Sequence, residues 1–361
     1  MTRLASVQSM RALAALLVVL VHCEPALSLI GLDERVVGAA AVGVDLFFVI
    51  SGFIMIYTTD RTAPAPVDFM IDRIARIVPL YWLLTGATFL IALSMPRLLG
   101  ATQANGADLL RSLLFIPYVR GDGLVYPVLY VGWSLNYEIL FYLIVAASLM
   151  LRRPAARLAV AAGAIVALVC AGLLLDPDRG AMRFFTRPLM LEFVFGMLLA
   201  RVYDRLPSSR RAARLAAGTA AIGVVLLLLA PFAPSFVLPP AGLAATLLLA
   251  SVLVMERGGL APDWRALLLI GDASYALYLT HSFVAQAVFK LSAALGLLTP
   301  ALAPALVGLT YLAACAVAVL VFQAVEKPMT RGTRTLLGRW RRTMRAGAPR
   351  AGLRERPVYP D

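Results

Sequence analysis

The chain is dominated by long apolar runs that short polar or basic segments separate. A run of roughly 18 to 25 apolar residues can cross the ~30 Å hydrocarbon core of a bilayer as a helix. Ten runs meet this description, so the pattern predicts an all-α, polytopic membrane bundle of about ten transmembrane helices. We expect spans at 12–31, 36–57, 76–96, 129–151, 157–175, 185–203, 213–231, 236–255, 268–291 and 303–325.

A shorter apolar run, residues 109–119, falls in the longest polar connection, residues 97–128. It is too short to cross the bilayer, so it predicts an interfacial or re-entrant helix. The connection around it contains Gly, Pro and Asn and would suit a lid or a substrate-facing loop.

Composition supports a membrane protein. Of the 361 residues, 61% are hydrophobic and only 15% are charged, and the mean hydropathy is +0.84. Soluble globular domains do not have this composition. Cys23, Cys170 and Cys315 all lie in apolar runs and form no disulfide framework. We therefore expect a multi-pass protein of the cell (inner) membrane.

The net charge of +13 raises the question of nucleic acid binding. The basic residues lie at the ends of the expected spans and in a basic tail, which favours membrane topology over nucleic acid. With the N-terminus inside, 25 of the 33 Lys and Arg residues fall on the inner segments. This asymmetry predicts that both termini are cytoplasmic. We expect a membrane domain at 1–328 and a poorly ordered, basic cytoplasmic tail at 329–361, with Trp340 as an interfacial anchor.

Arg11 and His22 are ionisable residues inside the first apolar run. Such residues are costly in a membrane and mark functional sites by default. Eleven residues make about three helical turns, so both side chains share one helix face about 16 Å apart along the axis. The spacing predicts an anion-binding group at one membrane surface and a proton-handling group near mid-depth.

Other polar residues fall inside the expected spans, namely Asp45, Glu138, Glu192 and His281. Any one of them could equally be a structural hydrogen-bonding anchor. Because there are several of them, these polar side chains would have to face one another or a water-filled cavity. Gly43 in the same span as Asp45, and Gly52 nine residues later, would allow close helix approach.

Arg73 and Arg76 are three residues apart and share a helix face. They are either positive-inside residues that reach the membrane surface or, with Arg11, a clamp for phosphates, because guanidinium groups pair bidentately with phosphate. Aromatic residues such as Trp133 and Tyr137 are typical of a core or an interface, but a carbohydrate would turn some of them into a stacking platform. Two histidines do not make a zinc site, so no metal is expected.

Six polar or aromatic patches follow one another along the chain, namely Arg11-x10-His22, GVDLFFVISGF (43–53), RIARIVPLYW (73–82), WSLNYEILFY (133–142), LIGDASYALYLTH (269–281) and VEKP (325–328). In this order, and across about residues 6–328, they resemble the acyltransferase-3 family of integral-membrane O-acyltransferases. Among these enzymes the chain looks most like the exopolysaccharide acetyltransferases of the succinoglycan type. It departs from many relatives at Ile139, where they carry a second acid, and at Asp72, where they carry an additional arginine.

The resemblance implies transfer of an acetyl group from acetyl-CoA to a hydroxyl of a lipid-linked surface-polysaccharide precursor, with polysaccharide assembly machinery as a further partner. Arg11, Arg73 and Arg76 would hold CoA phosphates. His22 would act as general base, since an unperturbed imidazole pKa of ~6.5 suits that task, and either Asp45 or Glu138 would orient it. Acceptor contacts are expected from Trp133, Tyr137 and His281.

Sequence alone leaves direct transfer and a transient acyl-His intermediate both open. Two other classes of protein also remain. Polar groups at mid-depth are typical of a transporter or a flippase for a lipid-linked sugar. A non-catalytic scaffold would need neither Arg11 nor His22.

Overall fold

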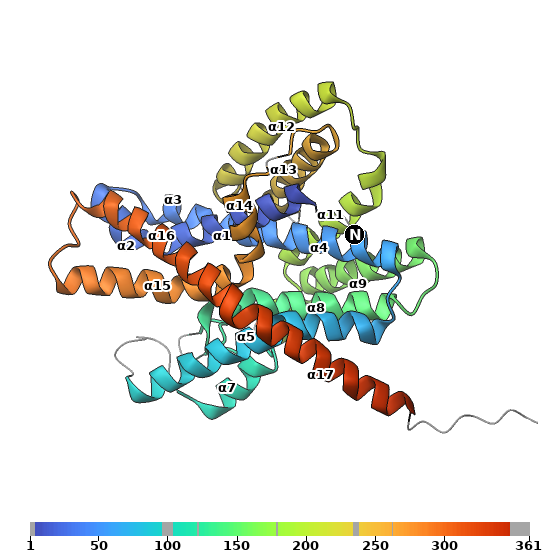
Figure 1. The fold of residues 1–361 in the computed structure, drawn as a ribbon, viewed down its shortest axis with the longest axis horizontal. Coiled ribbons are helices and arrows are strands. Elements are labelled where there is room, and N and C mark those ends of the chain that lie inside the picture. The colour runs from blue at the N-terminus through green and yellow to red at the C-terminus, as the bar shows by residue number, and fades with distance from the viewer. Residues whose placement is uncertain are drawn as a thin grey trace, which may run out of the picture.

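The structure is a computed structural model that describes residues 4–95, 104–120, 123–177, 180–233, 238–261 and 263–346. Within these residues the chain is entirely helical, without strands (Figure 1). The longer helices are α1 (Ala5–Val21), α4 (Val42–Thr62), α5 (Pro66–Ser94), α8 (Trp133–Ser148), α9 (Pro154–Leu175), α11 (Leu191–Val202), α12 (Arg210–Leu229), α13 (Pro240–Arg257), α15 (Ser274–Ala294), α16 (Ala303–Val321) and α17 (Lys327–Ala346). Shorter helices are α2 (Glu24–Leu27), α3 (Glu34–Gly38), α7 (Gly106–Leu113), α10 (Gly180–Phe185) and α14 (Arg265–Asp272).

Nine of the ten expected spans have a counterpart in the described helices. Seven helical runs are long and apolar enough to cross a membrane, and two bent pairs raise the number to nine. The pairs are α1 with α2 and its following turn, bent by 58°, and α14 with α15, bent by 80°. A multi-pass membrane bundle is therefore supported, while the count of ten and the cytoplasmic placement of both termini stay predictions.

The tenth expected span, 185–203, is interrupted. Arg187 is extended (φ −67°, ψ 144°) and precedes Pro188, so the helical run begins only at Pro188: a 3-10 turn, Pro188–Met190, leads directly into α11, and a second 3-10 turn, Tyr203–Arg205, follows it. Proline disfavours helical geometry at the residue before it, which explains the break. The whole run, residues 188–205, approaches the length needed to cross the hydrocarbon core, but it carries four charged residues, Glu192, Arg201, Asp204 and Arg205, which is more than any of the nine candidate spans has in its apolar window.

Glycines let α4 pack closely against α1 and α11 near the middle of the bundle (Figure 1). A Cβ at Gly43 would lie 2.4 Å from the carbonyl oxygen of Ala14, and one at Gly52 would lie 2.1 Å from that of Phe193. The close approach predicted at these two glycines is confirmed. Gly196 on α11 makes the same kind of close contact with α4, since a Cβ added to it would lie 1.9 Å from the Val49 carbonyl oxygen.

The substitution Gly196→Ala is expected to destabilise the bundle, because backbone rather than a flexible side chain occupies the space that the methyl group needs. Overpacking of this kind typically costs about 1–3 kcal/mol. The matched control is Gly163→Ala on α9, where nothing lies within 4 Å of the added carbon and alanine is the better helix former. Thermal unfolding in detergent should give a lower Tm for Gly196→Ala only; equal Tm values for the two variants would contradict the packing argument.

Helix α1 is fixed at both ends, which sets the positions of Arg11 and His22. The Glu256 carboxylate of α13 accepts hydrogen bonds from the backbone N–H groups of Ala5 (2.9 Å) and Ser6 (3.3 Å). A carboxylate there satisfies free N–H groups and interacts favourably with the helix dipole. At the other end α1 finishes at Val21, and His22 is its C-cap.

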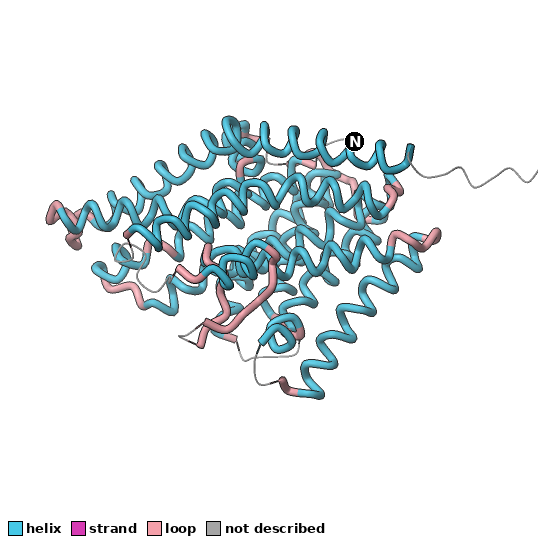
Figure 2. The backbone as a smooth tube through the Cα atoms, turned by 90° about the horizontal axis from the view of Figure 1, so that it is seen from below, coloured by secondary structure: helices cyan, strands magenta, loops and turns pink. Residues whose placement is uncertain are grey.

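The first part of the expected basic tail is helical. Residues 327–346 form helix α17, which lies against α5. Arg334 pairs with Asp72 at 2.7 Å and Arg341 pairs with Asp68. A π-helical turn, Phe322–Glu326, joins α16 to α17, and Figure 2 shows this long helical run along one side of the molecule up to the C-terminal trace. Residues 347–361 lie outside the described residues.

A short helix is present at the start of the run expected to form an interfacial or re-entrant helix. This helix, α7, covers Gly106–Leu113, whereas residues 114–119 of the expected run are not helical; its place at the membrane surface stays a prediction. Side chains of α5 hold it in place, because the Tyr81 hydroxyl donates to the Ser112 carbonyl at 3.1 Å and the Trp82 indole donates to the Leu113 carbonyl at 2.8 Å. Residues 96–103, at the start of the expected lid, lie outside the described residues.

Candidate active site

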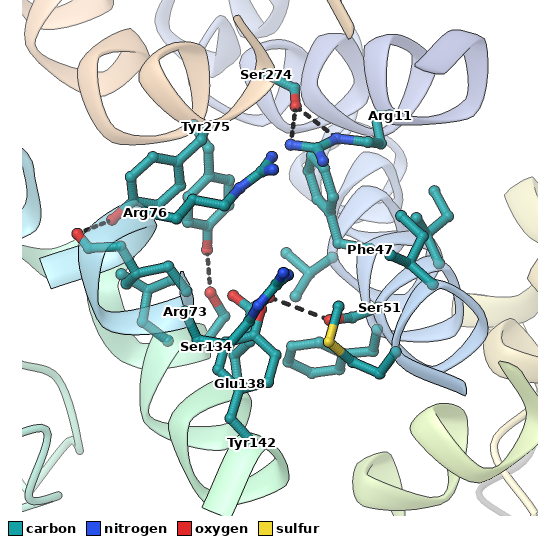
Figure 3. A pocket seen from close by; sticks show the side chains of 18 of the residues that line it. Arg11, Phe47, Ser51, Arg73, Arg76, Ser134, Glu138, Tyr142, Ser274 and Tyr275 are labelled. Atoms are coloured by element: carbon teal, nitrogen blue, oxygen red, sulfur yellow. Dashed lines mark hydrogen bonds between the residues drawn. The ribbon is translucent and has the colours of Figure 1, made fainter. Parts of the chain in front are cut away.

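A cavity of about 210 Å³ lies between α1, α4, α5, α8 and the start of α15. Three of the arginines singled out from the sequence line it, Arg11 from α1 and Arg73 and Arg76 from α5. Figure 3 shows the guanidinium groups of Arg11 and Arg76 directed into the same space, with Glu138 of α8 across from them. We call this space the arginine cavity.

Hydrogen bonds hold the walls of the arginine cavity. Arg11 donates through Nε and Nη2 to the Ser274 hydroxyl, at 3.0 and 2.8 Å. Ser274 begins α15 directly after the sharp bend at Ala273, so the bend positions the partner of Arg11. The Tyr275 hydroxyl donates to the Ile77 carbonyl at 2.7 Å and ties α15 to the helix that carries the other two arginines.

Positive charge exceeds negative charge among the lining residues. Glu138 is the one carboxylate that lines the arginine cavity within the described residues, against three arginines. It accepts hydrogen bonds from the Ser51 hydroxyl (3.1 Å) and the Tyr142 hydroxyl. The Nε of Arg73 is buried and has no hydrogen-bond partner among the described residues. A buried unsatisfied donor in a basic cavity favours an anionic ligand.

Glu326 is a charged residue that the sequence analysis did not single out. It ends the π-helical turn, is 5% exposed, and interacts electrostatically with Arg76 and Arg11. Its Oε2 has no hydrogen-bond partner among the described residues. The VEKP patch at 325–328 contained the signal, but its position at the very end of an apolar run resembles an ordinary membrane boundary.

The two histidines of the chain lie together, away from the arginine cavity. The rings of His22 and His281 have centroids 4.8 Å apart, and the Tyr130 ring lies 6.2 Å from that of His22. His22 also lines a cavity of about 250 Å³ that includes Glu24 and Gln286. The site therefore has two centres, an arginine cavity near one end of α1 and a histidine pair at its other end.

His281 has a defined tautomer. Its Nδ1 lies 3.0 Å from the Leu277 carbonyl oxygen, and its side chain is fully buried. Because a carbonyl only accepts, Nδ1 carries the proton of the neutral ring and Nε2 is left as an acceptor. That Nε2 has no partner among the described residues. The histidine pair thus contains a buried, unused acceptor.

Tyr278 lies between the two centres. It lines the arginine cavity, and its ring centroid is 6.0 Å from that of His281. Its hydroxyl shares a 2.6 Å hydrogen bond with Ser134 and donates to the Val131 carbonyl at 2.9 Å. These bonds fasten α15 to the start of α8, where Tyr130 contacts His22.

The two acids expected to orient His22 lie elsewhere. Asp45 lies against Glu192 of α11, which is fully buried, and Glu138 bonds with Ser51 and Tyr142 in the arginine cavity. Within the described part of the chain neither acid hydrogen-bonds to His22. The role assigned to each of them stays a prediction.

The predicted acceptor residues are also spread out. Trp133 lines a cavity of about 730 Å³. Tyr137 is fully buried behind it and donates to the Phe184 carbonyl at 2.7 Å. His281 belongs to the histidine pair. Of the three, Trp133 alone faces a large cavity.

The structure thus places a basic cavity and a histidine pair inside a helical bundle with several candidate membrane spans. The chain matches the profile of the acyltransferase domain, Acyl_transf_3, over residues 4–322. It therefore belongs to the acyltransferase-3 family, as the sequence patches predicted, and is a membrane acyltransferase. It is 39% identical over 298 residues to the exopolysaccharide production protein ExoZ of Rhizobium meliloti (strain 1021), an alignment that covers 81% of this chain and 90% of that relative. No solved structure matches the chain.

Proposed function

We propose that the protein transfers an acetyl group from acetyl-CoA to a hydroxyl of an exopolysaccharide precursor. One observation carries the proposal most directly. Three arginines, one with an unsatisfied buried Nε, converge at one end of the same helix that ends in His22. The kinship with an exopolysaccharide production protein supports the class of acceptor.

The arginine cavity suits the phosphates of the donor. Its volume is about 210 Å³, and three arginines lie in its walls; guanidinium groups pair bidentately with phosphate. A phosphate of the donor would bind there, and the rest of the CoA molecule would extend beyond it. Arg11 and His22 are about 16 Å apart along α1, and the thioester arm would follow this helix towards the histidine pair.

In the chemical step His22 removes the proton of the acceptor hydroxyl, whose oxygen attacks the thioester carbonyl. A C–O bond forms, the C–S bond breaks, and the leaving thiolate takes up a proton to give free CoA. In the alternative route His22 attacks the thioester carbonyl, a C–N bond forms as the C–S bond breaks, and CoA leaves as the free thiol; the acceptor oxygen then attacks the acyl-His, the C–O bond forms as the C–N bond breaks, and the hydroxyl proton returns to the imidazole. The buried acceptor Nε2 of His281 lies in the ring beside His22 and supports a proton-handling centre.

The proposal is tested by thiol release. Protein in lipid nanodiscs is given acetyl-CoA and a lipid-linked oligosaccharide, and the free thiol and the acetylated glycan are quantified together. Equal amounts of free thiol and acetylated glycan are expected. Without the acceptor, the only free thiol should come from slow hydrolysis of acetyl-CoA. Movement of the oligosaccharide across proteoliposomes without thiol release would identify a transporter or flippase instead.

The substitution Arg73→Gln is expected to raise the KM for acetyl-CoA about ten- to a hundredfold with little change in kcat. The reason is that a hydrogen bond to a charged group contributes about 1.5–3 kcal/mol. The matched control is Arg61→Gln on α4, since Arg61 pairs with Asp204 at 2.7 Å outside the arginine cavity. Steady-state kinetics with varied donor measure the effect, and an unchanged KM for Arg73→Gln would remove this residue from the donor site.

A further inference from the structure

The large cavity beside Trp133 has the chemistry of a binding site. Its volume is about 730 Å³, and its described walls come from residues 119 and 123–126, from Trp133 at the start of α8, and from residues of α10 together with Arg187 just after it. Three aromatic side chains line it, Tyr126, Trp133 and Phe184. Its charged lining residues among those described are two arginines, Arg183 and Arg187. We call this cavity the aromatic groove.

The Trp133 wall of the aromatic groove is rigid. Tyr137 lies directly behind it, with its ring stacked on Phe184 at 4.2 Å and edge-on to Trp133 at 6.1 Å. The Tyr137 hydroxyl donates to the Phe184 carbonyl and also contacts Arg187. An aromatic wall that is already packed loses little conformational entropy when a ligand binds.

The aromatic groove lies next to both centres of the active site. Trp133 faces the groove, whereas the next residue, Ser134, lines the arginine cavity. Tyr130, three residues before Trp133, contacts His22. The Tyr130 ring also lies 4.5 Å from the ring of Tyr126, which lines the groove. The ring of Tyr130 therefore separates the groove from the proposed general base.

We propose that the aromatic groove binds the acyl acceptor and selects a saccharide that carries an acidic group. A sugar ring would stack on Trp133, and Arg183 and Arg187 would pair with a carboxylate or phosphate, which guanidinium groups bind bidentately. This inference rests on the proposed function, because it names the class of acceptor for that reaction. The acidic group belongs either to an acidic sugar or to the diphosphate of a lipid carrier.

Direct binding in nanodiscs without donor tests the inference. Three fluorescent probes of equal sugar length are used: an oligosaccharide with one uronic acid, its neutral counterpart, and the neutral oligosaccharide on a lipid diphosphate. The wild-type protein should bind at least one acidic probe tenfold or more tightly than the neutral one. The acidic probe that binds more tightly identifies the source of the charge.

The double variant Arg183→Gln/Arg187→Gln should lose this preference, while its affinity for the neutral probe stays within about twofold. Trp133→Leu should weaken all three probes alike, and Trp133→Phe should retain most of the affinity. The matched control is Arg111→Gln on α7, since Arg111 is exposed and pairs with Asp108 outside the groove. Thermal unfolding and binding of acetyl-CoA establish that each variant is folded.

The inference is overturned if the wild-type protein does not discriminate between acidic and neutral probes, or if the double variant keeps the preference. These outcomes do not depend on catalysis. Preferential binding that needs both arginines, combined with absence of thiol release, would refute the acyl transfer and leave the acidic-saccharide site standing. Thiol release with a neutral acceptor, unaffected by the double variant, would support the transfer and refute the site.

Discussion

His22→Gln is expected to lower the rate of acetyl transfer by about 10²–10⁴, the usual contribution of a general base. Glutamine preserves much of the size and the hydrogen bonding of the side chain but cannot accept a proton. His22 lies at the end of α1, outside the arginine cavity. The KM for acetyl-CoA should therefore stay close to that of the wild-type protein.

The matched control is the same substitution at His281, whose ring lies 4.8 Å away. His281 is fully buried and is held by the Leu277 carbonyl, so we expect it to act by positioning its neighbour. The loss for His281→Gln should be smaller, and the double variant should be no slower than His22→Gln, since both residues serve one proton transfer. Additive losses, or full activity of His22→Gln in normally folded protein, would contradict the assignment.

A labelled donor separates the two chemical routes. With an acyl-His intermediate, radiolabelled acetyl-CoA without acceptor should leave label on the protein after a rapid quench, and His22→Gln should abolish this label. With direct transfer the wild-type protein remains unlabelled. Both routes predict the same loss of turnover, so the quench experiment is what distinguishes them.

The span pattern was largely predictable because hydrophobicity alone decides which segments cross a bilayer. The exceptions have local or tertiary causes. Residues 185–203 are apolar, but Pro188 breaks the helix after Arg187. Helix α17 is basic and contains glycine, and it lies against α5, where its arginines pair with Asp68 and Asp72. These ion pairs join segments that are far apart in the sequence, so they cannot be predicted from the hydrophobicity of one segment at a time.

The sequence predicted how far along each helix the polar side chains of the site lie, but not towards which neighbouring helix each side chain points. Depth and spacing pointed to Arg11, Arg73, Arg76 and Glu138, and the structure brings all four to one cavity. The same reasoning offered either Asp45 or Glu138 as the partner of His22, whereas Asp45 lies against Glu192 and Glu138 bonds with Ser51 and Tyr142. Rotation about a helix axis is fixed by packing, here by close contacts such as that of Gly52 with Phe193, and a single sequence does not reveal it.

Glu326→Gln is expected to lower the Tm of the ligand-free protein by several degrees. The Glu326 carboxylate is buried beside Arg76 and Arg11, and loss of one partner of a buried charge group typically costs about 3–5 kcal/mol. Without this charge the arginines repel each other with only Glu138 to compensate them inside the cavity. The matched control is Glu34→Gln on α3, where the acid is exposed and the Tm should not change.

The donor should then rescue the variant more than it stabilises the wild-type protein. An anionic ligand that binds only the folded state raises stability according to its affinity, and in Glu326→Gln its phosphates would supply the missing negative charge. The Tm increase produced by saturating CoA should therefore be larger for Glu326→Gln than for the wild type. The excess should disappear in Glu326→Gln/Arg73→Gln, in which a phosphate-binding arginine is also lost. An equal increase in all three proteins would show that CoA binds outside the arginine cavity, because only a ligand near these side chains is sensitive to both charges.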